Sequence, residues 1–115
     1  ALWQRDLSVS FNRIGTVLVA QGQGEAALAA FRDSHAIAER LARADPDHPG
    51  WQGDLAASHG KLGLVHVALG DPATARRHFQ AGRAIVAGLV GRFPDIVLWR
   101  RYLEQFDQVL ASLPP

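Results

Sequence analysis

Cysteine is absent from the 115-residue chain, and this absence excludes several kinds of chemistry at once. Without cysteine there is no disulfide framework, no thiolate nucleophile and no cysteine-ligated zinc. A chain without disulfides is compatible with a reducing compartment, and we therefore expect a cytoplasmic protein.

Methionine is also absent, even from the first position, and the chain opens abruptly on Ala-Leu-Trp. Lysine occurs once, at Lys61, whereas arginine and alanine are abundant. The abrupt opening predicts a segment of a longer protein, and the arginine and alanine bias suggests a GC-rich bacterial genome. We therefore expect a module of a larger bacterial protein.

Long apolar runs and a strong charge are both missing. No stretch approaches the roughly 18 apolar residues that a membrane-spanning helix needs, and no signal-peptide pattern opens the chain. A formal net charge of +1 offers little attraction to nucleic acid. With 48% apolar and 20% charged residues, the composition is that of an ordinary soluble domain spanning residues 1–115, without a membrane partner.

The three tryptophans mark an internal repeat. Trp3, Trp51 and Trp99 are separated by 48 residues each. Further pairs at this offset are Ser10/Ser58, Gly15/Gly63, Gly22/Gly70, Ala27/Ala75, Phe31/Phe79 and Pro46/Pro94. A period of this size is the signature of stacked-repeat architectures. We divide the chain into a first unit (3–50), a second unit (51–98) and a partial third unit (99–115) that caps the stack.

Each unit has the pattern of two helices. From Trp3 to Leu18, apolar residues recur at intervals of three and four, the spacing of one helical face. Turn signals at Gly22 and Gly70 separate the helices, and Asp71-Pro72 has the residue types of an N-cap and a first turn. The expected helices are 2–21, 25–44, 50–69, 72–92 and 96–112, and no segment has the pattern of a strand.

These helices resemble the tetratricopeptide repeat, whose pattern is W-x2-L-G-x2-Y, then A-x3-F, then P. The matching motifs are Phe11-x2-Ile14-Gly15-x2-Leu18 with Ala27-x3-Phe31, and His59-x2-Leu62-Gly63-x2-His66 with Ala75-x3-Phe79. The unit of 48 residues is longer than the usual 34, so that each helix gains about two turns. Such units are similar to the elongated repeats of multidomain bacterial proteins, which often follow a signalling ATPase or protease-like domain.

The resemblance implies an all-α fold, a right-handed α-α superhelix (TPR-like solenoid) with two antiparallel helix pairs plus a C-terminal capping helix. It also implies a non-catalytic scaffold that binds a protein or peptide on a concave side lined by the first helix of each unit. Transferred around the Leu-Gly landmark, the peptide-binding positions are Val9, Asn12, Arg13, Thr16, Ala57, Gly60, Lys61 and Leu64. Arg13 and Lys61 are repeat equivalents that present two cations to acidic groups, or are two solvated cations.

Two other functions remain open at this stage. The exposed ends of the stack could self-associate and so oligomerise the parent protein. The arginine-rich second helix of unit two could bind nucleic acid, although a solvated basic face is the simpler interpretation; its residues are Arg76, Arg77, His78, Arg83 and Arg92.

No residue pattern predicts an enzyme, a cofactor or a metal site. The five histidines lack an H-E-x-x-H motif or a carboxylate cluster, and we interpret them as polar surface or half-buried filler. His59 and His66 are about two turns apart, too far to share a metal from one helix. The tryptophans are expected to pack between units rather than to form an exposed ladder. Asp6 and Asp54 are expected in first helical turns, facing the helix dipole.

Overall fold

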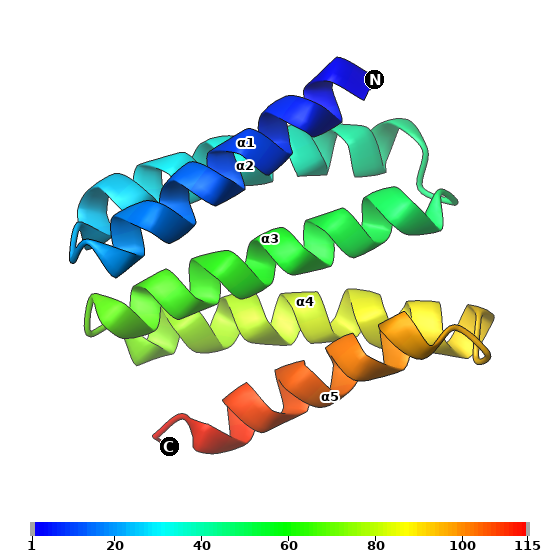
Figure 1. Ribbon diagram of the computed structural model, residues 1–115. Coiled ribbons are helices and arrows are strands. Elements are labelled where there is room, and N and C mark those ends of the chain that lie inside the picture. The colour runs from blue at the N-terminus through cyan, green and yellow to red at the C-terminus, as the bar shows by residue number, and fades with distance from the viewer. Residues whose placement is uncertain (1, 115) are drawn as a thin grey trace.

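Five helices, each antiparallel to the next, form the part of the chain that the computed structural model describes, residues 2–114, with only the backbone at position 2 (Figure 1). They are α1 (Leu2–Ala20), α2 (Gly24–Ala44), α3 (Pro49–Ala68), α4 (Pro72–Arg92) and α5 (Val97–Ser112). Every boundary lies within one residue of its expected position, and residues 2–114 contain no strand. The expected all-α, tetratricopeptide-like solenoid is confirmed.

The helices stack in chain order. Each helix packs mainly against its neighbours in the sequence, and α1 touches α3 only slightly. The α1–α2 pair therefore forms one end of the stack and α5 the other, as Figure 1 shows. The result is a slab of 37 × 36 × 20 Å. Because the first helices α1, α3 and α5 follow one another along one side, their exposed residues form a common surface.

Glycine ends the first helix of each complete unit. Gly22 and Gly70 have φ values of 74° and 79°, a left-handed conformation that side chains with a Cβ rarely adopt. At both turns the next residue returns a hydrogen bond into the helix, from Gln23 N to Leu18 O and from Asp71 N to His66 O, each 2.8 Å long. This is the Schellman arrangement, which satisfies the last carbonyls and reverses the chain within a few residues.

Side-chain caps start the next helices. Asp71 accepts a hydrogen bond from Thr74 N at 3.1 Å, as the Asp-Pro pair predicts, and this bonding holds the pKa of Asp71 below its ordinary value. His48 Nδ1 accepts from Trp51 N at 3.1 Å at the start of α3. The first-turn position expected for Asp6 and Asp54 is wrong, because α1 and α3 begin four or five residues before them. Asp54 instead pairs with Arg5, with Nε and Oδ2 2.9 Å apart.

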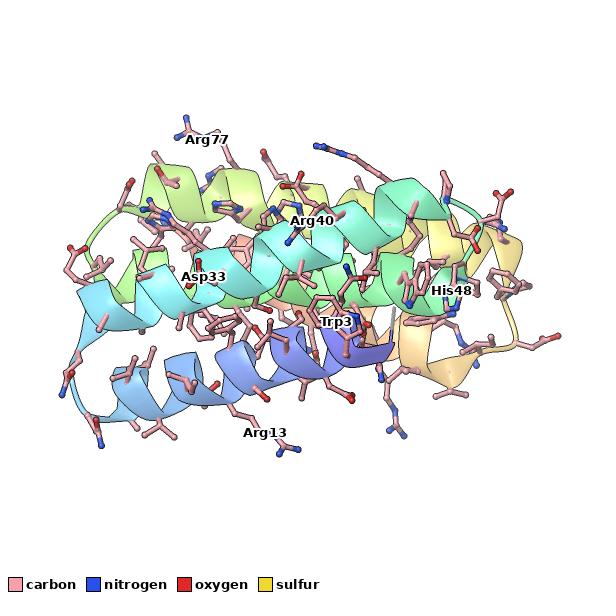
Figure 2. All side chains as sticks on the ribbon, turned by 90° about the horizontal axis from the view of Figure 1, so that it is seen from above. Trp3, Arg13, Asp33, Arg40, His48 and Arg77 are labelled. Atoms are coloured by element: carbon pink, nitrogen blue, oxygen red, sulfur yellow. The ribbon has the colours of Figure 1, made fainter. Side chains whose placement is uncertain are left out.

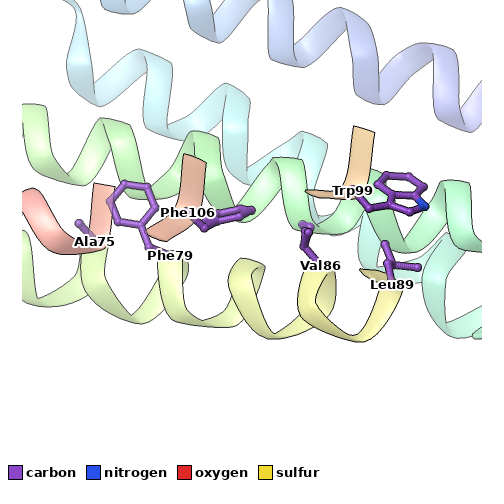
Figure 3. Packing of buried hydrophobic residues seen from close by; sticks show 7 residues of the cluster. Ala75, Phe79, Val86, Leu89, Trp99 and Phe106 are labelled. Carbon is purple, nitrogen blue, oxygen red and sulfur yellow. The ribbon is translucent and has the colours of Figure 1, made fainter. Parts of the chain in front are cut away.

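The core has one apolar cluster for each complete unit. The first joins Ala27, Leu28 and Phe31 of α2 to Leu62 and Val65 of α3. The second lies among α3, α4 and α5, and consists of Ala56, Ala75, Phe79, Val86, Leu89, Trp99 and Phe106 (Figure 3). Each phenylalanine of the A-x3-F motif therefore reaches the first helix of the following unit, which binds successive units together.

Glycine allows the two helices of a unit to approach. A Cβ atom added to Gly15 would lie 2.5 Å from Cε1 of Phe31, and the same addition to Gly63 would strike the Phe79 ring. Carbon atoms in contact are normally about 3.5–4.0 Å apart, so that only glycine fits at these positions. The close approach expected from the motif is confirmed.

The tryptophans are not equivalent in their packing. Trp99 is 8% exposed and lies on Gly53, where an added Cβ would be 2.6 Å from its ring. Trp51 is half-buried and stacks on His48, with the ring centroids 4.4 Å apart. It meets Arg5, which stands where unit two has Gly53, so that this tryptophan cannot lie as deep. Trp3 is 68% exposed, and the expectation that it packs between units is wrong.

We predict opposite effects for two glycine-to-alanine substitutions. Gly63→Ala should lower the free energy of unfolding by about 1–3 kcal/mol, because the Phe79 ring must move to admit the methyl group. Gly88→Ala should raise it by about 0.5–1 kcal/mol, since Gly88 lies in α4 with nothing near its Cβ position and alanine favours the helix. Urea unfolding followed by circular dichroism measures both, and equal effects would contradict the close-packing argument.

Candidate functional site

The eight sequence-predicted site residues line two neighbouring hollows on the side formed by the first helices. The hollow between α1 and α3 contains all four positions predicted in unit one. Its lining residues are Val9, Asn12, Arg13, Thr16, Val17 and Lys61. The transferred positions of unit one therefore share one surface, and Lys61 reaches it from α3.

The second hollow lies among α3, α4 and α5, with a volume of about 290 Å³. It contains the four positions predicted in unit two, together with residues that the sequence analysis did not nominate. Its lining residues are Ala57, Gly60, Lys61, Leu64, Phe79, Tyr102, Gln105, Phe106 and Val109. Lys61 lines both hollows, so that the two hollows meet at its side chain.

Two of the additional residues follow the 48-residue repeat. Gln105 and Val109 are the third-unit equivalents of Ala57 and Lys61, so that applying the same rule to α5 would have found them. Tyr102 and Phe106 occupy positions held by Asp54 and Ser58 in unit two. The repeat gives no signal for these aromatic residues, and only the packing of α5 against α3 and α4 brings them into the site.

The second hollow is apolar with a cationic rim. Phe79, Phe106 and Tyr102 contribute aromatic rings to its lining. A Cβ atom added to Gly60 would lie 3.6 Å from the Phe106 ring, which is an ordinary van der Waals distance. A larger residue at position 60 would occupy part of the hollow. Such an apolar recess with a few polar groups has the chemistry of a site for an apolar side chain.

The two predicted cations, Arg13 and Lys61, have no carboxylate partner among the residues that the structure describes. Arg13 is directed away from the helices in Figure 2, whereas Lys61 is half-buried between the two hollows. Asn12 Oδ1, beside them, is buried and accepts no hydrogen bond within the described part of the chain.

The arginines of α4 each contact another group of the chain. Arg76 donates to the carbonyl oxygen of Pro114, Arg77 donates to Thr74 Oγ1 at 3.1 Å, and Arg83 pairs with Asp107. Arg92 lies over the Phe93 ring, 5.2 Å from its centroid. Only Arg83 therefore has a carboxylate partner among the described residues, and the contacts of Arg76, Arg77 and Arg92 leave their positive charges uncompensated.

Four histidines form a cluster that sequence spacing did not predict. His35 of α2, His59 and His66 of α3, and His78 of α4 meet with ring centroids 4.5 to 6.3 Å apart. His59 Nδ1 lies 3.1 Å from His78 Nδ1, and His35 Nδ1 lies 2.7 Å from Ser58 Oγ. His59 and His66 are seven residues apart, but His78 lies between them from the facing helix. Even so, the described residues contain no group of three or more ligands arranged to hold a metal ion.

Burial favours the neutral form of three of these imidazoles, those of His35, His59 and His78. Burial lowers the pKa of His59 to about 4, assisted by the charges of His35 and His78. Burial also lowers the pKa of His35, against the opposing effect of Glu39, whose Oε1 is 3.5 Å from His35 Nε2. The pKa of His78 is lowered by burial first, then by His66, His35, Arg77 and Arg32. The junction between the units is therefore built around uncharged histidine.

We predict that acid destabilises this junction. Since the folded pKa values lie below the unfolded value near 6.5, stability is complete above about pH 6.5 and falls as the pH drops towards about 4. The slope should be roughly 1.4 kcal/mol per pH unit for each additional proton that the unfolded chain binds. Urea midpoints measured across this range test the prediction.

His59→Gln is the matched variant for this pH dependence. It removes the group with the lowest pKa in the cluster, and it should flatten the dependence between pH 6.5 and 4 relative to the natural chain. An unchanged slope in the variant would show that acidic groups elsewhere, and not the cluster, control the loss of stability.

Comparison with known proteins agrees with the fold and the motif positions. A sequence model of the tetratricopeptide repeat family matches residues 6–87, which are 82 of the 115 residues. No curated protein and no solved structure gives a match. Within residues 2–114, no helix is both long and apolar enough to cross a membrane. Repeats of this kind generally mediate protein–protein interaction. Because the match covers more than half of the chain, with all of α2 and α3 and most of α1 and α4, the chain belongs to the tetratricopeptide repeat family.

Proposed function

We propose that this chain is a non-catalytic module that binds a peptide segment of another protein along α1, α3 and α5. The observation that carries the proposal is the position of Lys61, whose side chain borders both hollows. A peptide lying across the first helices passes this cation between the two hollows. The site residues are Val9, Asn12, Arg13, Thr16, Ala57, Gly60, Lys61 and Leu64, extended by Tyr102, Gln105 and Val109.

The chemistry favours a peptide with an apolar anchor beside acidic residues. Burying one large apolar side chain among Tyr102, Phe106 and Phe79 contributes about 1.5–3 kcal/mol, whereas an exposed ion pair contributes about 0.2–1 kcal/mol. The anchor therefore supplies most of the affinity. Arg13 and Lys61 supply orientation and selection for acidic sequences.

The proposal extends to the organisation of the parent protein. We infer that residues 1–115 act as one module with units 3–50, 51–98 and 99–115, carried in a larger cytoplasmic bacterial protein. In that setting the module would bring a client to the domains beside it, as other repeat modules do.

A peptide-display selection against the whole chain tests the site. We expect enriched sequences to combine one large apolar residue with Asp or Glu. Tyr102→Ala and Lys61→Glu should each weaken the selected peptides about tenfold or more, equivalent to about 1.4 kcal/mol. Fluorescence anisotropy with a labelled peptide measures the change.

Arg40→Glu is the matched control. Arg40 is exposed on α2, away from both hollows, and its reversal changes the net charge as much as that of Lys61 does. If Arg40→Glu weakened peptide binding as strongly as Lys61→Glu does, the binding would reflect general charge attraction. Selected peptides that bind equally well to the Tyr102→Ala and Lys61→Glu variants would place the binding face elsewhere.

A further inference from the structure

The outer face of α1 is apolar and uncovered. Ile14 and Val17 are 50% and 55% exposed, and Trp3 and Leu7 are exposed on the same face. Apolar residues recur here with the spacing of one helical face, which in an end helix normally faces a core. Contiguous exposed apolar surface of this kind marks an interaction site.

The repeat shows what the same face does elsewhere in the molecule. Leu62 and Val65 of α3 are the equivalents of Ile14 and Val17, and they are 2% and 0% exposed. Both pack against Ala27, Leu28 and Phe31, on the second helix of the preceding unit. The residues of α1 are therefore one half of an interface whose other half is a second helix with the A-x3-F motif.

This interface occurs a second time within the chain. Leu110 of α5, the equivalent of Ile14 and Leu62, packs against the cluster that contains Ala75 and Phe79 of α4. Both α2 and α4 thus already hold the first helix of the next unit. A second copy of this chain has no free second-helix face to offer to α1.

The opposite end of the stack is more polar along α5, although Val97 and Leu98 at its start are exposed. In α1 and α3 the face towards the unit's own second helix carries Gly15 and Gly63. On the corresponding face of α5 lie Glu104, Asp107 and Ala111, all exposed, with Asp107 paired to Arg83. A solenoid ends where its outer face is polar. The two ends are therefore unlike, because the face of α5 at these positions is polar and that of α1 is apolar.

We propose that the outer face of α1 docks the second helix of a further tetratricopeptide unit, placed one 48-residue period ahead of α2 in the same polypeptide. Ile14 and Val17 would then take the buried positions that Leu62 and Val65 hold in α3, and Trp3 and Leu7 would become half-buried like their equivalents in α3. This assignment rests on the end of the stack, and of its four residues only Val17 also lines the hollow between α1 and α3.

The test is a chain with residues 1–48 repeated in front of residue 1. Residue 1 is the repeat equivalent of residue 49, so the added copy of α2 precedes α1 in the register in which α2 precedes α3. We expect one cooperative unfolding transition with a Tm several degrees higher. Amides of the original α1 should exchange with solvent at least about tenfold more slowly.

Ile14→Arg, made only in the original α1, separates docking from general destabilisation. In the natural chain this change should leave the Tm nearly unaltered, because Ile14 is half exposed. In the extended chain it should remove the added protection of α1. An extension that unfolds separately and leaves α1 exchange unchanged would overturn the proposal.

A second copy of the chain is the other candidate to cover this face of α1. Light scattering on the natural chain at high concentration should show a monomer. A dimer that Ile14→Arg dissociates would show that α1 faces a second copy, and would likewise overturn the proposal. Both measurements are made without peptide, so neither outcome bears on the test of the peptide site.

Discussion

The whole stack depends on how closely the two helices of a unit approach at a glycine. Gly15 against Phe31 and Gly63 against Phe79 leave no space for a methyl group, so that each phenylalanine ring lies flush with the first helix of its unit. The same rings extend into the clusters that hold the next unit, through Leu62 and Val65 in one case and through α5 in the other. One contact thus determines both the pairing within a unit and the spacing between units.

Differences at equivalent positions give this regular scaffold its individual features. Gly53 lets Trp99 sink into the core, whereas Arg5 at the same position keeps Trp51 shallow and pairs with Asp54. Gly60 leaves room beside Phe106, whereas the equivalent position in unit one is occupied by the larger Asn12. The second hollow therefore arises from a small residue in α3 and aromatic residues in α5. It lies at the junction of two units and belongs to neither unit alone.

The histidine cluster is a feature of the same kind. Its members come from α2, α3 and α4, and none has a histidine at the offset of 48. Burial opposes the protonation of His35, His59 and His78, and neighbouring positive charges add to this effect at His59 and His78. The fold is thus coupled to pH at the place where its units meet, while the apolar clusters on either side are indifferent to pH.

The sequence by itself determined the helices, the period and the close contacts. Glycine turns, the Asp71 cap and the A-x3-F motif act over a few residues, so that local chemistry sufficed to place every helix boundary within one residue. The family resemblance, transferred around the Leu-Gly landmark of each unit, also pointed to positions on α1 and α3 that line the hollows. Only the tertiary structure decided that Tyr102 and Phe106 complete the recess, that four histidines meet, and that Trp3 stays exposed while Trp99 is buried. These outcomes depend on which side chain a neighbouring helix presents, and sequence spacing along one helix does not contain that information.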